Sequence, residues 1–164
     1  MSMLRAATIA TVLISTFASP FASAATATGS FQVSLTIQGA CSVQSASNLS
    51  FGSTTTLPAD VDVTSSIGVQ CTTTTPYTIG VSAGGGTGAT VATRLLTAGA
   101  ATLPYTVYRD SGRTQVWGVT AGVDTVAGTG NGAVQSFTVY GRLPQAASPA
   151  VGSYTDSLSV IVTY

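Results

Sequence analysis

The chain has 164 residues, of which 45% are hydrophobic and 6% are charged, with five basic and five acidic side chains and no histidine. Every basic side chain is arginine and every acidic one is aspartate. The chain therefore lacks the lysine of a P-loop or Schiff base and the histidine of a Ser–His triad, and it has no basic surface for phosphates, so we expect neither an enzyme nor a nucleic-acid-binding protein.

Residues 1–24 have the features of a secretory signal peptide. Arg5 supplies the basic start, residues 6–18 form an apolar run, and Ala22–Ala24 fits a small-residue cleavage site. This run is too short to cross a bilayer and no later stretch reaches about 18 apolar residues, so we expect no membrane insertion of the mature chain. The remaining 140 residues (164 − 24) suffice for one secreted domain.

The first β-strand pattern after the signal peptide is unusually long. Phe31, Val33, Leu35 and Ile37 alternate with polar residues, and the alternation keeps its phase through Gly39 to Val43. A strand over these residues would extend about 40 Å, roughly twice the usual length. The segment therefore either turns back at Gly39 or leaves the domain with its front half, and the pattern leaves both open.

Further strands are predicted by the same alternation and by β-branched and aromatic residues. A hairpin turn is expected at Asp110–Gly112, with Gly112 in the positive φ that such turns need, and loops at 84–88, 128–132 and 144–149. The pattern favours one antiparallel sandwich. The predicted strands cover 61–71, 77–81, 103–109, 114–119, 134–141 and 158–164.

Cys41 and Cys71 are the two cysteines of the chain. In a secreted protein we expect them to form a disulfide, pointing inward because Cys71 shares a strand face with Ile67 and Val69. A metal site is the alternative, but two cysteines without histidine make an incomplete zinc set. We expect no metal and no cofactor.

Two other groups of residues have a functional and a structural interpretation. Asp60 and Asp62 could be calcium ligands, but calcium takes six to eight oxygens, so solvated carboxylates at a strand entry are favoured. Trp117, Tyr105 and Tyr108 could line a ligand groove, but core and hairpin packing is favoured on alternating strands.

The C-terminal strand pattern has no later strand to pair with. Leu158, Val160, Val162 and Tyr164 share its apolar phase. Unless another segment covers it, this strand offers unpaired backbone groups at a sheet edge. A free apolar strand at one end and an open edge at the other make a head-to-tail contact, and such contacts build filaments.

The chain resembles the spore coat protein U domain family, which includes the Csu-type pilins of archaic chaperone–usher pili. The resemblance covers nearly all of residues 29–164. It rests on Cys41, Phe51–Gly52, Val69–Thr72, Pro76–Thr78, Arg94, Tyr105–Asp110, Trp117–Gly118, Val139–Arg142, Gly152–Asp156, Val160, Val162 and Tyr164.

The resemblance implies an all-β, incomplete immunoglobulin-like antiparallel sandwich over 39–164 that lacks its last strand, preceded by a donor strand in 25–38. A periplasmic chaperone would fill the gap, and an outer-membrane usher would then replace it with the arm of an identical or related pilin subunit. Phe31, Val33, Leu35 and Ile37 would be the donor anchors, and Leu158, Val160, Val162 and Tyr164 the acceptor edge.

This implies a non-enzymatic fibre subunit, exported through the periplasm to the cell surface and supporting adhesion or biofilm formation. The alternative is a secreted spore-coat or surface protein of the same fold that uses 29–38 within its own sheet.

Overall fold

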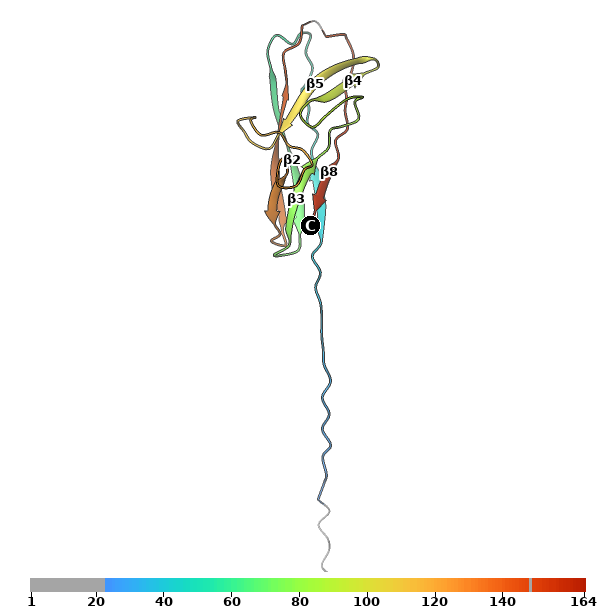
Figure 1. The fold of residues 1–164 in the computed structure, drawn as a ribbon, viewed down its shortest axis with the longest axis vertical. Coiled ribbons are helices and arrows are strands. Elements are labelled where there is room, and N and C mark those ends of the chain that lie inside the picture. The colour runs from blue at the N-terminus through green and yellow to red at the C-terminus, as the bar shows by residue number, and fades with distance from the viewer. Residues whose placement is uncertain (1–22, 148) are drawn as a thin grey trace, which may run out of the picture. The chain divides into compact units, whose positions relative to one another are not determined.

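A computed structural model describes residues 23–147 and 149–164 (Figure 1). The predicted signal peptide lies outside the described residues, except for its last two. The chain divides into two units, one ending at Thr36 and one spanning Ile37–Tyr164. In the first unit, residues 23–36 form no strand and their side chains are exposed. Of the two alternatives left open by the pattern, a turn back into a strand of the same molecule is therefore not seen in residues 23–36.

The second unit is an antiparallel β-sandwich of two sheets. One sheet has the strand order β1-β2-β7-β5-β4 and the other β6-β3-β8. In Figure 1, β8 lies beside β3, and the C-terminus follows directly after β8. The strands are β1 (Cys41–Ala46), β2 (Val61–Cys71), β3 (Pro76–Val81), β4 (Arg94–Ala98), β5 (Ala101–Tyr108), β6 (Val126–Thr129), β7 (Val134–Leu143) and β8 (Val160–Thr163).

The pair β2–β7 forms the centre of the larger sheet. It is in continuous register from Val61 opposite Leu143 to Gln70 opposite Val134. Val69 and Ile79, from the two sheets, are fully buried. Trp117 is also fully buried, and its indole Nε1 donates a hydrogen bond to the Ile79 carbonyl at 2.8 Å. The predicted sandwich is confirmed, and Trp117 is a core residue.

The hairpin after β5 differs from its prediction. Residues 114–119 form no strand and contribute only the bridge of Val116 to Tyr108. The cause is the Asp110 carboxylate, which accepts the backbone N–H groups of Thr114 and Gln115 at 2.7–3.2 Å and so bends the chain. The positive φ also falls on Arg113, at 54°, and not on Gly112.

Three other boundaries differ. Strand β6 includes residues 128 and 129 of a predicted loop, and β4 was not predicted at all. Strand β8 is shorter than the predicted 158–164, because its ladder with β3 covers Val160 to Thr163. No helix among the residues described is long and apolar enough to span a membrane.

Candidate strand-acceptor site

Strand β8 uses one of its two edges. The Ser82 N–H donates to the Ser159 carbonyl at 3.0 Å, and pairing continues to Thr78 opposite Thr163. In an antiparallel ladder alternate residues point their backbone groups to opposite sides, so Ile161 and Thr163 face β3. The backbone N–H and C=O of Val160 and Val162 therefore face away from β3. Across residues 23–147 and 149–164, no strand pairs with that side.

Strand β1 presents a second open edge close to the first. It pairs only with β2 among the strands described, and its Cα atoms approach those of β8 within 8 Å. The Thr72 N–H donates to the Ala40 carbonyl at 2.8 Å, so the backbone groups of Cys41 and Val43 point to the open side by the same alternation.

Val43 shows that a neighbour is missing on the core side of β1. It lies opposite Val69, and cross-strand partners share a face of the sheet. Val69 is fully buried, whereas Val43 is 42% exposed. An inward-facing valine at this exposure indicates that the sandwich is uncovered beside β1.

The apolar face of β8 points into the sandwich. Leu158, Val160 and Val162 are half-buried against the core, whereas Ile161 points outward and is 46% exposed. The structure thus brings three of the four predicted acceptor residues onto one face. Tyr164 follows the strand and is 62% exposed.

A groove of about 1130 Å³ opens between the two sheets of the second unit. Leu158 and Val160 belong to its lining, as do Phe51, Tyr105 and Val139. Its remaining large apolar lining residues are Leu49, Leu57, Ile67, Val81, Leu96, Leu103, Leu143, Val151 and Tyr154.

One polar link crosses this groove. The Tyr105 hydroxyl donates to Asp156 Oδ2 at 2.7 Å, and Oδ1 accepts the backbone N–H groups of Gly85 and Ser157 at 2.8 Å. Burial and the bond to Asp156 raise the pKa of Tyr105, so it is a neutral donor at physiological pH. The link joins β5 of one sheet to the segment that leads into β8 of the other. Sequence patterns did not reveal it, because Tyr105 and Asp156 are 51 residues apart.

The predicted donor anchors carry large exposed apolar surfaces. Phe31, Val33, Leu35 and Ile37 are 77–88% exposed. No charged residue occurs in 25–38. Four exposed large apolar side chains at alternate positions are typical of a segment that binds elsewhere.

Cys41 and Cys71 form a disulfide between the first residue of β1 and the last residue of β2. Cys71 is 1% exposed, in agreement with its inward direction. The two residues face each other directly in the β1–β2 register. The bridge therefore fixes β1 at the point where it follows the exposed segment.

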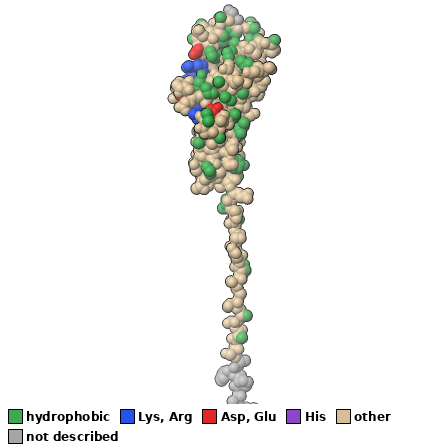
Figure 2. All heavy atoms as spheres, viewed as in Figure 1, with side chains coloured by type: hydrophobic (Ala, Val, Ile, Leu, Met, Phe, Trp, Pro, Cys, Tyr) green, Lys and Arg blue, Asp and Glu red, His purple; other side chains and the backbone are tan. Residues whose placement is uncertain are grey.

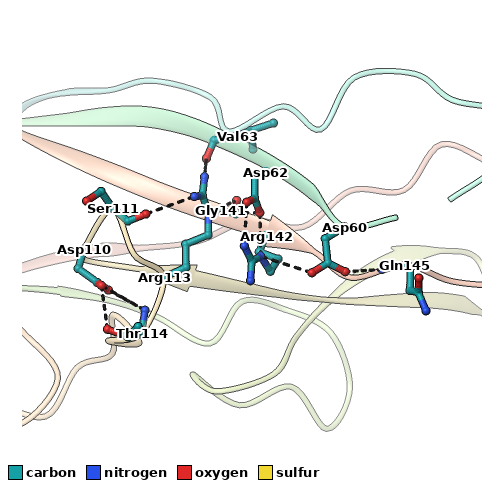
Figure 3. Close-up of polar contacts among 10 residues, drawn as sticks. All are labelled: Asp60, Asp62, Val63, Asp110, Ser111, Arg113, Thr114, Gly141, Arg142 and Gln145. Carbon is teal, nitrogen blue, oxygen red and sulfur yellow. Dashed lines mark hydrogen bonds and ion pairs between the residues drawn. The ribbon is translucent and has the colours of Figure 1, made fainter. Parts of the chain in front are cut away.

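Asp60 and Asp62 form ion pairs with Arg142 (Figure 3). They are therefore not the solvated carboxylates that the sequence favoured. Arg142 lies opposite Asp62 in the β2–β7 ladder and donates two hydrogen bonds to its carboxylate, both at 2.8 Å. Arg113 approaches the same carboxylate at 3.3 Å. The hydrogen bond from Arg142 and the charge of Arg113 lower the pKa of Asp62. Among the residues described, no group of three or more potential metal ligands is present.

Arg94 is a buried cation to which the sequence patterns assign no role. Its side chain is fully buried and donates to the carbonyls of Ser82, Val91, Val81 and Trp117 at 2.6–3.0 Å. These bonds join β4 to the end of β3 and to the segment around Trp117. The four arginines among the described residues are buried or half-buried, and Figure 2 shows a face dominated by uncharged atoms.

The chain is similar to known proteins in sequence and in fold. It is 32% identical to Protein U of Myxococcus xanthus over 158 residues, which cover 87% of this chain and 88% of that protein. Its fold is similar to a crystal structure of the CsuC–CsuE chaperone–tip adhesion subunit pre-assembly complex from archaic chaperone–usher Csu pili of Acinetobacter baumannii. That match has a TM-score of 0.57 at 22% identity, and covers 79% of this chain and 40% of the solved chain.

The likeness to the Csu structure agrees with the predicted immunoglobulin-like class of sandwich. The model of the Spore Coat Protein U domain matches residues 27–161, which include most of the exposed segment and all of β1 to β7. The chain belongs to the spore coat protein U domain family.

Proposed function

We propose that this protein is a structural subunit of a secreted surface fibre, in which residues 25–38 of one copy complete the sandwich of another. We call residues 25–38 the donor arm. The observation that carries the proposal is the unpaired edge of β8, with the backbone groups of Val160 and Val162 directed away from β3. The same chain also carries an exposed segment with the apolar alternation of a strand.

The donor arm and the acceptor edge match in length. Phe31 to Ile37 and Leu158 to Tyr164 each span six residue steps, or about 20 Å in extended form. Each contributes four apolar positions at a spacing of about 6.7 Å. Strand addition draws its affinity from backbone hydrogen bonds and its specificity from alternate side chains, and both halves of that interaction are available here.

The edges must separate for a strand to enter between them. Strands in a sheet lie about 4.8 Å apart, so a strand between β8 and β1 would hold them about 9.6 Å apart. Their Cα atoms now approach within 8 Å. We therefore expect β1 and β8 to move apart by at least about 1.5 Å when the donor arm enters.

The four anchors would contribute roughly 6–12 kcal/mol as an upper bound, at about 1.5–3 kcal/mol for each side chain buried. This is comparable with the whole stability of a domain. An uncomplemented subunit would therefore be prone to aggregate, which favours a periplasmic chaperone that covers the edge and an outer-membrane usher that exchanges it. A cell-surface fibre with a role in adhesion or biofilm formation is the expected product.

A non-polymerising coat or surface protein is the second candidate. The likeness to Protein U over 88% of that protein's length and the description of the matching family favour it. It predicts that residues 29–38 pair within their own molecule.

The two candidates are separated by assembly of the purified mature chain. We expect slow growth of rod-like multimers in electron micrographs and in light scattering. Leu35→Asp should prevent this growth, and Ser34→Asp, in the opposite phase, is the matched control. A chain without residues 25–38 should cap growing ends, because it accepts an arm but donates none. A stable monomer whose fold is lost on deletion of 25–38 would support the coat protein instead.

A further inference from the structure

Contacts at Ala40 and Cys41 hold the chain where it enters the folded unit. The Ala40 N–H donates to the Thr72 hydroxyl at 3.2 Å, and the Ala40 carbonyl accepts the Thr72 N–H at 2.8 Å. Cys41 is bonded covalently to Cys71. We call these contacts the root clamp.

Gly39 packs closely against the Thr75 side chain of the β2–β3 turn. A Cβ atom built on Gly39 would lie 2.9 Å from the Thr75 hydroxyl oxygen and 3.0 Å from its methyl carbon. The root clamp thus holds three consecutive residues, 39–41, against residues 71–75. All of these residues belong to the second unit.

Strand β1 itself is weakly attached beyond the clamp. It has six residues, of which five are exposed, and its pairing with β2 is interrupted between Val43 and Ser45. Its other edge has no partner among the strands described. A short edge strand with such pairing is easily peeled from a sheet.

Strand β2 is the opposite case. It has 11 residues and an unbroken register with β7 from Val61 to Gln70. Its last residues contribute Val69 and Cys71 to the buried core. Force applied at Cys71 therefore acts on the most extensively paired strand of the unit.

We propose that the root clamp passes tension from the donor arm directly to Cys71 at the end of β2, so that β1 and the loop after it carry no load. This proposal rests on the proposed fibre function for its purpose, but the load path follows from the bonds of a single chain. Force along the arm reaches residues 39–41 first, and the disulfide then carries it to Cys71, so that residues 42–70, which include the rest of β2, lie outside the covalent load path. Without the bridge, the first structure under load is the β1–β2 ladder.

Single-molecule force spectroscopy of the mature chain tests the load path without any fibre. One handle is attached at the N-terminus and the other to an azide-bearing residue at Ser111, which is exposed and lies outside β8. Under oxidising conditions we expect one cooperative rupture. After reduction in the instrument we expect an earlier, weaker step of at most about 70 Å, the contour of the roughly 20 residues between Cys41 and the start of β2.

Reduction in place avoids a variant that fails to fold, and C41S/C71S should reproduce the early step where it folds. Asp62→Asn, with the disulfide intact, controls for general destabilisation and should show no early step. In the oxidised chain Thr72→Val should leave the first rupture force unchanged. In the reduced chain the same substitution should lower that force.

An unchanged first rupture after reduction would overturn the proposal, because β1 would then not be the weaker element. An early step in the Asp62→Asn chain would also overturn it, because stability alone would explain the effect. If the force measurements give the expected results but no fibres grow, only the proposed function is contradicted.

Discussion

Truncation of a single donor anchor should weaken strand addition by an amount that its exposure sets. Leu35 is 86% exposed in the structure, so nearly its whole side chain is available for burial. Leu35→Ala removes about 2 kcal/mol of transfer free energy at about 0.8 kcal/mol for each methylene equivalent. This loss corresponds to a dissociation constant that is roughly 30-fold higher.

The measurement is the binding of a fluorescent peptide of residues 25–38 to the mature chain, followed by anisotropy. Ser34→Ala in the peptide is the matched control, because position 34 has the opposite phase and should lie outside the groove. We expect a change of less than about twofold for the control. Equal losses for Leu35→Ala and Ser34→Ala would refute the alternating-anchor reasoning, since affinity would then not depend on which face enters the groove.

Three further predictions concern the folded unit. Removing the Cys41–Cys71 bridge, which closes a separation of 30 residues, should lower stability by about 3.6 kcal/mol on the loop-entropy model and the melting temperature by roughly 10–15 °C. Calorimetry with and without reductant tests this, and an unchanged transition would contradict it. Arg94→Met should cost about 3 kcal/mol or more, measured by urea unfolding, because four carbonyls lose their donor and the bonds to two of them, those of Val81 and Trp117, are buried. A cost below about 1 kcal/mol would show that these carbonyls find other partners. Burial raises the pKa values of Tyr77 and Tyr105 above 10.0, so their contribution to stability is complete below pH 10 and is lost as the pH rises through their folded pKa values. Tyr105→Phe should flatten this alkaline loss in pH-dependent urea melts, and an equally steep loss would remove Tyr105 as its source.

The sequence predicts the strands whose burial alternates along the chain. Strand β2 has the predicted bounds 61–71, and β3, β5 and β7 differ from their predictions by only a few residues. Each of them has one face against the core, so hydrophobic alternation records its orientation. Strands β4 and β6 lack this signal, because Arg94–Ala98 and Val126–Thr129 contain no sustained alternation and are held by their neighbours.

The polar contacts could not be predicted, because their partners meet only through the topology. Asp62 and Arg142 are 80 residues apart and become neighbours through the β2–β7 register. Calcium ligands and solvated carboxylates were the two interpretations open to Asp60 and Asp62, and neither includes an arginine from another strand. The same limit applies to the Tyr105–Asp156 link across the groove.

The candidate acceptor edge was only partly visible in the sequence. The alternation of Leu158, Val160 and Val162 indicated the face of β8 that meets the core. It could not indicate that β1 lies near β8 or that Val43 remains exposed beside it, because both depend on how the two sheets stack. The donor role of Phe31, Val33, Leu35 and Ile37 stays a proposal.

Amide hydrogen exchange along β8 tests the central proposal most directly. In the mature chain held monomeric at low concentration, the N–H groups of Ile161 and Thr163 should be protected by β3, whereas those of Val160 and Val162 should exchange rapidly. Adding the peptide of residues 25–38 should protect Val160 and Val162 and leave Ile161 and Thr163 as they were. Protection of all four amides in the monomer before any peptide is added would contradict the proposal, since the edge of β8 would already be filled by its own chain.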